Sequence, residues 1–101
     1  MNNEDIKKIR RNDEAVWRVI DDEVVVLIPG ERALHALRGC GSRVWELIDG
    51  ETTIAEIIQQ ICTEYEVEPQ KAREEINEYV SRLAAINLVD IMPVTGEEIK
   101  R

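Results

Sequence analysis

Residues 24–50 read VVVLIPGERALHALRGCGSRVWELIDG, and the pattern changes from strand to helix within them. Residues 24–28 are apolar throughout, which is typical of a central strand covered on both faces, and a Pro-Gly pair ends the run. Residues 32–37 alternate weakly, as expected of a third strand at the edge of a sheet. From residue 44 apolar side chains recur at helical spacing, until an Asp-Gly helix stop at residues 49–50. The stretch therefore predicts strands first and helices after them.

The segment before this stretch predicts a partner strand. Residues 15–20 are rich in β-branched and aromatic side chains, which favours a strand over a helix. Asp21 and Asp22 supply a tight turn between this strand and residues 24–28. The two strands should form a hairpin.

Two longer helices are expected after the first one. Thr53 with Glu56 three residues later is the signature of a capping box, and apolar residues follow at helical spacing as far as Tyr65. Pro69 stands where a third helix can begin, and the apolar stripe behind it ends near Asn87.

The order of these elements predicts an α+β, winged-helix-like fold, in which a three-stranded antiparallel sheet is followed by three helices. Residues 88–92 are expected to add a short closing strand. We expect one domain over residues 14–92, with a flexible N-terminal arm over residues 1–13 and a flexible C-terminal tail over residues 93–101.

Composition restricts the classes of function. A chain of 101 residues fits one domain and is too short for a multi-domain enzyme. The net charge of −8 disfavours nucleic acid and anionic membranes as partners, because both are bound by basic clusters. With no apolar run near the ~20 residues of a membrane span and no signal peptide, the expected location is the cytoplasm. Cys40 and Cys62 have no spacing typical of a disulfide framework or zinc site, so each should be a free, buried or half-buried thiol.

No arrangement of residues predicts catalysis, so the chain is expected not to be an enzyme and to need no cofactor or metal. His35 has no constellation of Ser, Cys or carboxylate around it, which favours a structural or surface role. Cys40 between two glycines could be a reactive thiol at a helix N-terminus, but a glycine turn explains the same residues and is favoured. Asp21, Asp22 and Glu23 lack the ligand spacing of a calcium loop and are more typical of a solvated hairpin tip.

Binding of another protein remains as the main class of function. The third helix is in the position of a DNA-recognition helix, but it carries three glutamates beside its three basic residues, Lys71, Arg73 and Arg82. The open edge of the third strand, and the groove between that strand and the third helix, could take a protein ligand. Two alternatives stay open: a winged-helix DNA-binding regulator, and a dimerising structural module without a peptide ligand.

The signature of the PqqD family is similar to three parts of this sequence. They are the stretch from Leu37 to Gly50, the segment Thr53-Ile54-Ala55-Glu56-Ile57 that follows it, and residues 65–69 before the last helix. The resemblance covers roughly residues 14–92, and its most specific part is Val-Trp-Glu-Leu-Ile-Asp-Gly at residues 44–50. Arg38 stands where the family commonly has Asn. These are small proteins of pyrroloquinoline quinone (PQQ) biosynthesis, and their relatives recognise precursor peptides that are ribosomally made and then modified.

The resemblance implies a chaperone-like adaptor that binds a precursor's leader by strand addition and presents it to a modifying enzyme, such as a radical SAM protein or a leader peptidase. The strand would be laid along residues 32–37, with the third helix as the other wall of the groove. The expected contact residues are Arg32, Ala33, Leu34, His35, Ala36, Leu37, Glu75, Tyr79 and Arg82.

Overall fold

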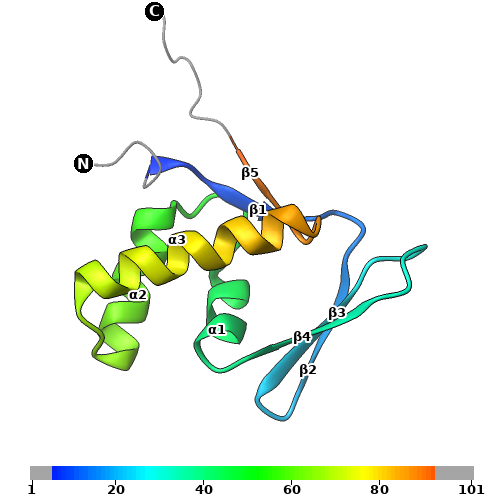
Figure 1. The fold of residues 1–101 in the computed structure, drawn as a ribbon, viewed down its shortest axis with the longest axis horizontal. Helices are drawn as coiled ribbons and strands as arrows, with labels where there is room; N and C mark the ends of the chain where they lie inside the picture. The colour runs from blue at the N-terminus through cyan, green and yellow to red at the C-terminus, as the bar shows by residue number, and fades with distance from the viewer. Residues whose placement is uncertain (1–5, 93–101) are drawn as a thin grey trace, which may run out of the picture.

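The computed structural model describes residues 6–92 and has the predicted α+β architecture (Figure 1). A three-stranded antiparallel sheet is followed by three helices, which confirms the predicted order. A second sheet of two short strands joins the two ends of the described chain. The elements are β1 (Ile9–Arg11), β2 (Val16–Ile20), β3 (Glu23–Leu27), β4 (Leu34–Arg38), α1 (Cys40–Leu47), α2 (Ile54–Tyr65), α3 (Pro69–Ala85) and β5 (Val89–Ile91).

In the three-stranded sheet, β3 lies between β2 and β4, and β4 is therefore at an edge, as predicted. The strand begins at Leu34, two residues later than expected, so Arg32 and Ala33 lie in the connection before it. The expectation that the central strand is covered on both faces is wrong. Val24 and Val26 are buried, whereas Leu27 on the opposite face is exposed, because the core packs against one face only.

The expected flexible arm over residues 1–13 contains an ordered strand, β1. Ile9 is fully buried and its carbonyl accepts a hydrogen bond of 2.8 Å from the Gly50 amide. The strand pairs antiparallel with β5, where residue 9 lies opposite Ile91. A chain end that is too polar to pack alone is thus ordered by main-chain pairing with the other end. The rest of the arm before residue 6, and the whole expected tail over residues 93–101, lie outside the described residues.

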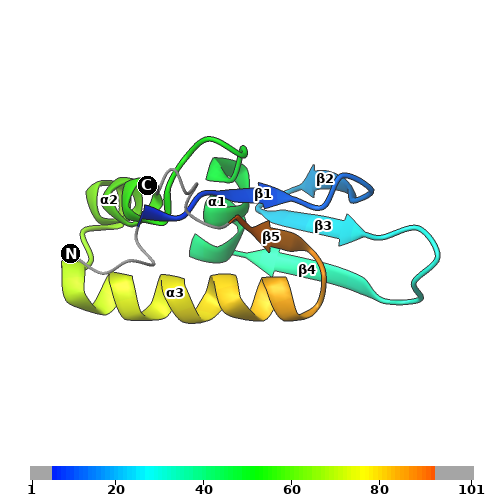
Figure 2. The ribbon, with the colours of Figure 1, turned by 90° about the horizontal axis from the view of Figure 1, so that it is seen from above.

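The helices begin and end where local rules place them. The Thr53 side chain accepts a hydrogen bond from the Glu56 amide at 3.1 Å, and the Glu56 side chain accepts one from the Thr53 amide at 2.9 Å. This is the predicted capping box. Pro69 opens α3, and one stripe of that helix is buried. Figure 2 shows α3 running along one side of the molecule, past α2 and α1, with its C-terminal end on the side of the strands.

A cluster around Trp45 joins the sheet to the helices. The indole of Trp45 is fully buried and meets the ring of Trp17 edge to face, with 5.9 Å between ring centroids. The Arg11 guanidinium lies 4.6 Å from the centre of the Trp17 ring, and its Nη2 donates a 3.0 Å hydrogen bond to the Trp45 carbonyl. One side chain from β1 thereby connects β2 with α1.

Replacing Ile9 with alanine tests whether β1 belongs to the core. We expect Ile9→Ala to lower the free energy of unfolding by about 2–5 kcal/mol, because it removes a fully buried side chain and leaves a cavity. Urea unfolding measures the change. Ile6→Ala is the matched control, since Ile6 is 42% exposed and its loss should cost no more than about 0.5 kcal/mol. Equal midpoints for the two variants would contradict the assignment.

Candidate functional site

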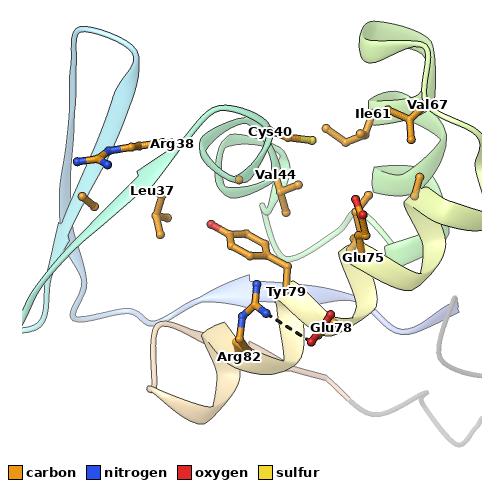
Figure 3. Close-up of a pocket in the computed structure, with 14 residues that line it drawn as sticks. Leu37, Arg38, Cys40, Val44, Ile61, Val67, Glu75, Glu78, Tyr79 and Arg82 are labelled. Atoms are coloured by element: carbon orange, nitrogen blue, oxygen red, sulfur yellow. Dashed lines mark ion pairs between the residues drawn. The ribbon is translucent and has the colours of Figure 1, made fainter.

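A groove of about 460 Å³ lies between the edge strand β4, the first turns of α1, and α3 (Figure 3). Its lining residues come from every element that surrounds it and combine an apolar floor with charged rims. They are Ala36, Leu37, Arg38, Cys40, Gly41, Val44, Ile61, Val67, Ala72, Glu75, Ile76, Glu78, Tyr79 and Arg82.

The floor of the groove is the margin of the hydrophobic core. Val44, Ile61 and Ile76, from the three different helices, are each 5% exposed or less and still line the groove. A ligand side chain placed there would leave water for an apolar surface, which is favourable by about 25 cal/mol per Å² of area buried. The floor is therefore suited to an apolar side chain.

Cys40 and Tyr79 stand in the groove, and both stay protonated at neutral pH. Burial raises the pKa of the Cys40 thiol, and the charges of Glu75 and Glu64 raise it further. Cys40 is the first residue of α1, so it does lie at a helix N-terminus, as the reactive-thiol alternative required, and not in a glycine turn before the helix. Its raised pKa nevertheless makes the thiol a poor nucleophile. Cys40 and Cys62 are both half-buried and free, as predicted.

The ring of Tyr79 reaches from α3 toward β4 and the start of α1 (Figure 3). It packs so closely over Gly41 that a methyl group at that position would lie 2.6 Å from the phenol oxygen. Burial raises the pKa of Tyr79 to about 12. Close packing over a glycine fixes the ring at the centre of one wall.

Paired charges form the rim on the α3 side. Arg82 lies 3.5 Å from Glu78, and its guanidinium is 5.8 Å from the centre of the Tyr79 ring. Glu75 lies 3.7 Å from Lys71. Exposed pairs at i,i+4 contribute little to stability and are easily rearranged, so these side chains are available to polar groups of a ligand.

The edge of β4 offers main-chain groups to a ligand. A two-residue turn joins β2 to β3, and such a turn is closed by a hydrogen-bonded pair, here Ile20 and Glu23. Because bonding alternates along antiparallel strands, the β3 residues that bond to β4 are the buried valines at 24 and 26. The amide and carbonyl groups that point away from the sheet then belong to Leu34, Ala36 and Arg38.

The structure brings together five of the nine predicted contact residues. Ala36 and Leu37 line the groove on one side, and Glu75, Tyr79 and Arg82 line it on the other. Leu34 and His35 lie in β4 outside the lining, and Arg32 and Ala33 precede the strand.

Sequence reasoning missed the groove floor, because Val44, Ile61 and Ile76 carry the same helical periodicity as the rest of the core. Glu78 could have been found from its position one helical turn from residues 75 and 82. Arg38 also lines the groove, but its guanidinium is bonded to Glu23 at 2.6 Å and points away from Tyr79 (Figure 3).

The described residues give no sign of a metal site or a membrane span. Within residues 6–92, no three His, Cys, Asp or Glu side chains are grouped so as to hold a metal ion. Asp21 and Asp22 are the exposed turn of the β2–β3 hairpin. In the same part of the chain, none of the helices has the length and apolarity needed to cross a bilayer.

Comparisons with known proteins agree with this geometry. The model of the family of coenzyme PQQ synthesis protein D (PqqD) matches residues 23–89, and the chain belongs to that family. A solved structure titled TbiB1 in complex with the TbiA(beta) leader peptide superposes with a TM-score of 0.75 at 31% sequence identity. The match covers 80% of this chain and 94% of TbiB1. No curated protein gives a significant match.

The ionisation of Tyr79 tests how deeply its ring is packed. In a Tyr65→Phe background, we expect the remaining tyrosine to ionise near pH 12 in the folded chain and near pH 10 in urea. Folding favours the neutral phenol. Burial of the Tyr79 ring therefore contributes fully to the free energy of unfolding below about pH 10, and this contribution is lost as the pH rises toward 12. Ultraviolet absorbance of the phenolate measures both titrations. Coincident titration curves would show that the ring is not desolvated.

Proposed function

We propose that this protein is a non-enzymatic adaptor that binds the leader segment of a ribosomally made precursor peptide. The observation that carries the proposal is an open strand edge beside an apolar groove, in a member of the PqqD family. The leader would add to the sheet as a strand next to β4, with α3 as the opposite wall. The similar protein TbiB1 was solved in complex with a leader peptide, which supports a leader as the ligand.

Main-chain pairing alone is too weak to hold a flexible peptide. Three outward-facing residues of β4 offer hydrogen bonds worth about 0.5–1.5 kcal/mol each in net terms. Ordering the peptide costs about 2–5 kcal/mol, and association itself costs several kcal/mol more. Burial of one Leu or Ile side chain contributes about 1.5–3 kcal/mol, so the leader needs apolar anchors in the groove floor. Glu75, Tyr79 and Arg82 would then select among leaders that share such anchors.

The adaptor would act by presenting the bound precursor to a separate modifying enzyme, such as a radical SAM protein or a leader peptidase. A tethered substrate reaches an effective concentration in the millimolar range, without any catalytic group in the adaptor. The adaptor needs no cofactor of its own for this role. Because ribosomally made precursors are released in the cytoplasm, we place the adaptor there.

The DNA-binding alternative gains no support from the geometry. Lys71 and Arg82 on α3 each lie beside a glutamate of the same helix, so a phosphate that approached this helix would meet carboxylates as well as cations.

Proline at the centre of β4 tests strand addition. Ala36→Pro removes an amide that points away from the sheet and leaves the bonds to β3 intact, so the chain should fold. We expect affinity for a labelled candidate leader peptide that the parent chain binds to fall at least tenfold. Fluorescence anisotropy measures binding, and circular dichroism checks the fold.

Val19→Pro is the matched control, because the same alternation makes its amide point outward at the other free edge of the sheet. It should bind the leader like the parent chain. If the two proline variants bind equally well, β4 is not the site of strand addition.

A methyl group on Gly41 tests the role of the Tyr79 wall. Gly41→Ala favours the α1 helix by up to about 1 kcal/mol but forces the phenol ring out of its position. We expect a fold of similar stability with leader affinity lowered about tenfold. Ser42→Ala, one residue along the same helix, should leave affinity unchanged. Unaltered binding by Gly41→Ala would remove Tyr79 from the proposed wall.

A further inference from the structure

The sheet has a second apolar surface, on the face turned away from the core. The register places Val16, Leu27 and Leu34 side by side in one row across the three strands, and they are 59%, 38% and 65% exposed. The same face carries Ile20, which is 50% exposed, and the half-buried Val25. We call this surface the outer face. In Figure 1 the three helices all lie on the other side of the sheet.

This composition is unusual for an exposed sheet face. An antiparallel sheet with one packed face normally alternates apolar and polar residues along each strand. In β3 that alternation is missing, because Val24 and Val26 enter the core while Val25 and Leu27 face outward. No described element covers the outward residues. A contiguous exposed apolar surface of this kind marks a site of interaction.

Arg18 indicates that the partner of the outer face carries a negative charge. It lies in the middle row, opposite Val25, and no carboxylate of residues 6–92 is within ion-pair distance of it, although acidic residues outnumber basic ones by 21 to 13. The other cation of this face, Arg38, is already bonded to Glu23. An apolar surface with one unpaired guanidinium in its middle row, on the edge strand β2, is complementary to an apolar patch that bears a carboxylate.

The area argues against a second copy of this chain as the occupant. Three strands of five residues have a footprint of roughly 17 × 14 Å, or about 240 Å². A stable interface needs about 800 Å² on each partner, so two copies meeting through this face would bury too little. The partner must therefore extend beyond the sheet.

A leader bound at β4 would supply the missing extension. An added strand continues the same sheet, and alternate side chains of the leader then lie on the same side as Leu34 and Ala36. We infer that the outer face is the docking surface for the modifying enzyme, which contacts it with an apolar patch and a carboxylate opposite Arg18. This inference rests on the proposed function for the nature of the partner. The enzyme would then contact the adaptor and the bound leader through one continuous surface.

The test titrates the purified enzyme that modifies the bound precursor with the full chain, with and without the leader peptide. Val16→Thr/Ile20→Thr keeps β-branched residues in exposed positions, so the fold should be retained. We expect this variant to bind the enzyme at least tenfold more weakly. Arg18→Gln should weaken binding about tenfold, and Arg18→Lys should restore part of it. Leader should strengthen enzyme binding by the parent chain.

Controls separate the inference from the proposed function. Ile86→Thr removes an apolar side chain that is 43% exposed and lies outside the sheet, and it should bind the enzyme normally. All outer-face variants should bind the isolated leader like the parent chain, which is measured separately.

Enzyme affinity unchanged by Val16→Thr/Ile20→Thr and by Arg18→Gln would overturn the inference even if leader binding is intact. A parent dimer that the same variants dissociate would overturn it in favour of a second copy. Failure of the parent to bind leader contradicts the proposed function, while the leader-free enzyme titration still decides the outer face.

Discussion

The packing of the sheet against the helices depends on the burial of Trp45. Its indole is enclosed between the sheet and the helices, and its carbonyl holds Arg11 from the N-terminal strand. The indole Nε1 has no hydrogen-bond partner within the described chain, which costs about 1–3 kcal/mol. Apolar burial and the edge contact with Trp17 offset that cost. Because Trp45 fixes α1, it also fixes Cys40, Gly41 and Val44, which lie on α1 and line the groove.

The openness of β4 follows from the path of the chain around it. Gly39, at φ 57°, turns the chain directly from the end of β4 into α1, so the next segment packs beside the strand without pairing with its free edge. The strand β5 returns from α3 and pairs with β1 instead. The free edge and α3 are thus left facing each other across the groove. An edge strand left unpaired in this way is a template for another chain, and here an apolar floor accompanies it.

The chemistry of the groove is that of binding. The Cys40 thiol and the Tyr79 phenol both have raised pKa values and are neutral at physiological pH, while Arg82 and Glu75 are paired with residues of their own helix. Affinity would come from main-chain pairing and apolar burial, and the rim would contribute selectivity. On the sheet's other surface Arg18 has no such partner, which gives the two faces of β2–β3–β4 different binding character.

Most of the fold could be predicted from the sequence because turn and helix-capping signals act over a few residues. The β2–β3 turn at Asp21 and Asp22, the capping box of Thr53 and Glu56, and Pro69 at the start of α3 each act over a few residues, so their outcome does not depend on the rest of the chain. The family signature was visible for the same reason. The edge position of β4 followed from element order, whereas the five groove residues followed from the strand addition that the family resemblance implies.

Tertiary structure decided what depends on distant partners. Ile9–Arg11 becomes a strand only because Val89–Ile91 lies beside it, about eighty residues later in the chain. The apolar run of β3 is compatible with one covered face or with two, and only the packing shows that Val25 and Leu27 were left outside. Val44, Ile61 and Ile76 have the periodicity of ordinary core residues, and the gap between β4 and α3 alone turns them into a floor. Periodicity specifies which face of an element is apolar, whereas the surface that meets that face is set by the whole chain.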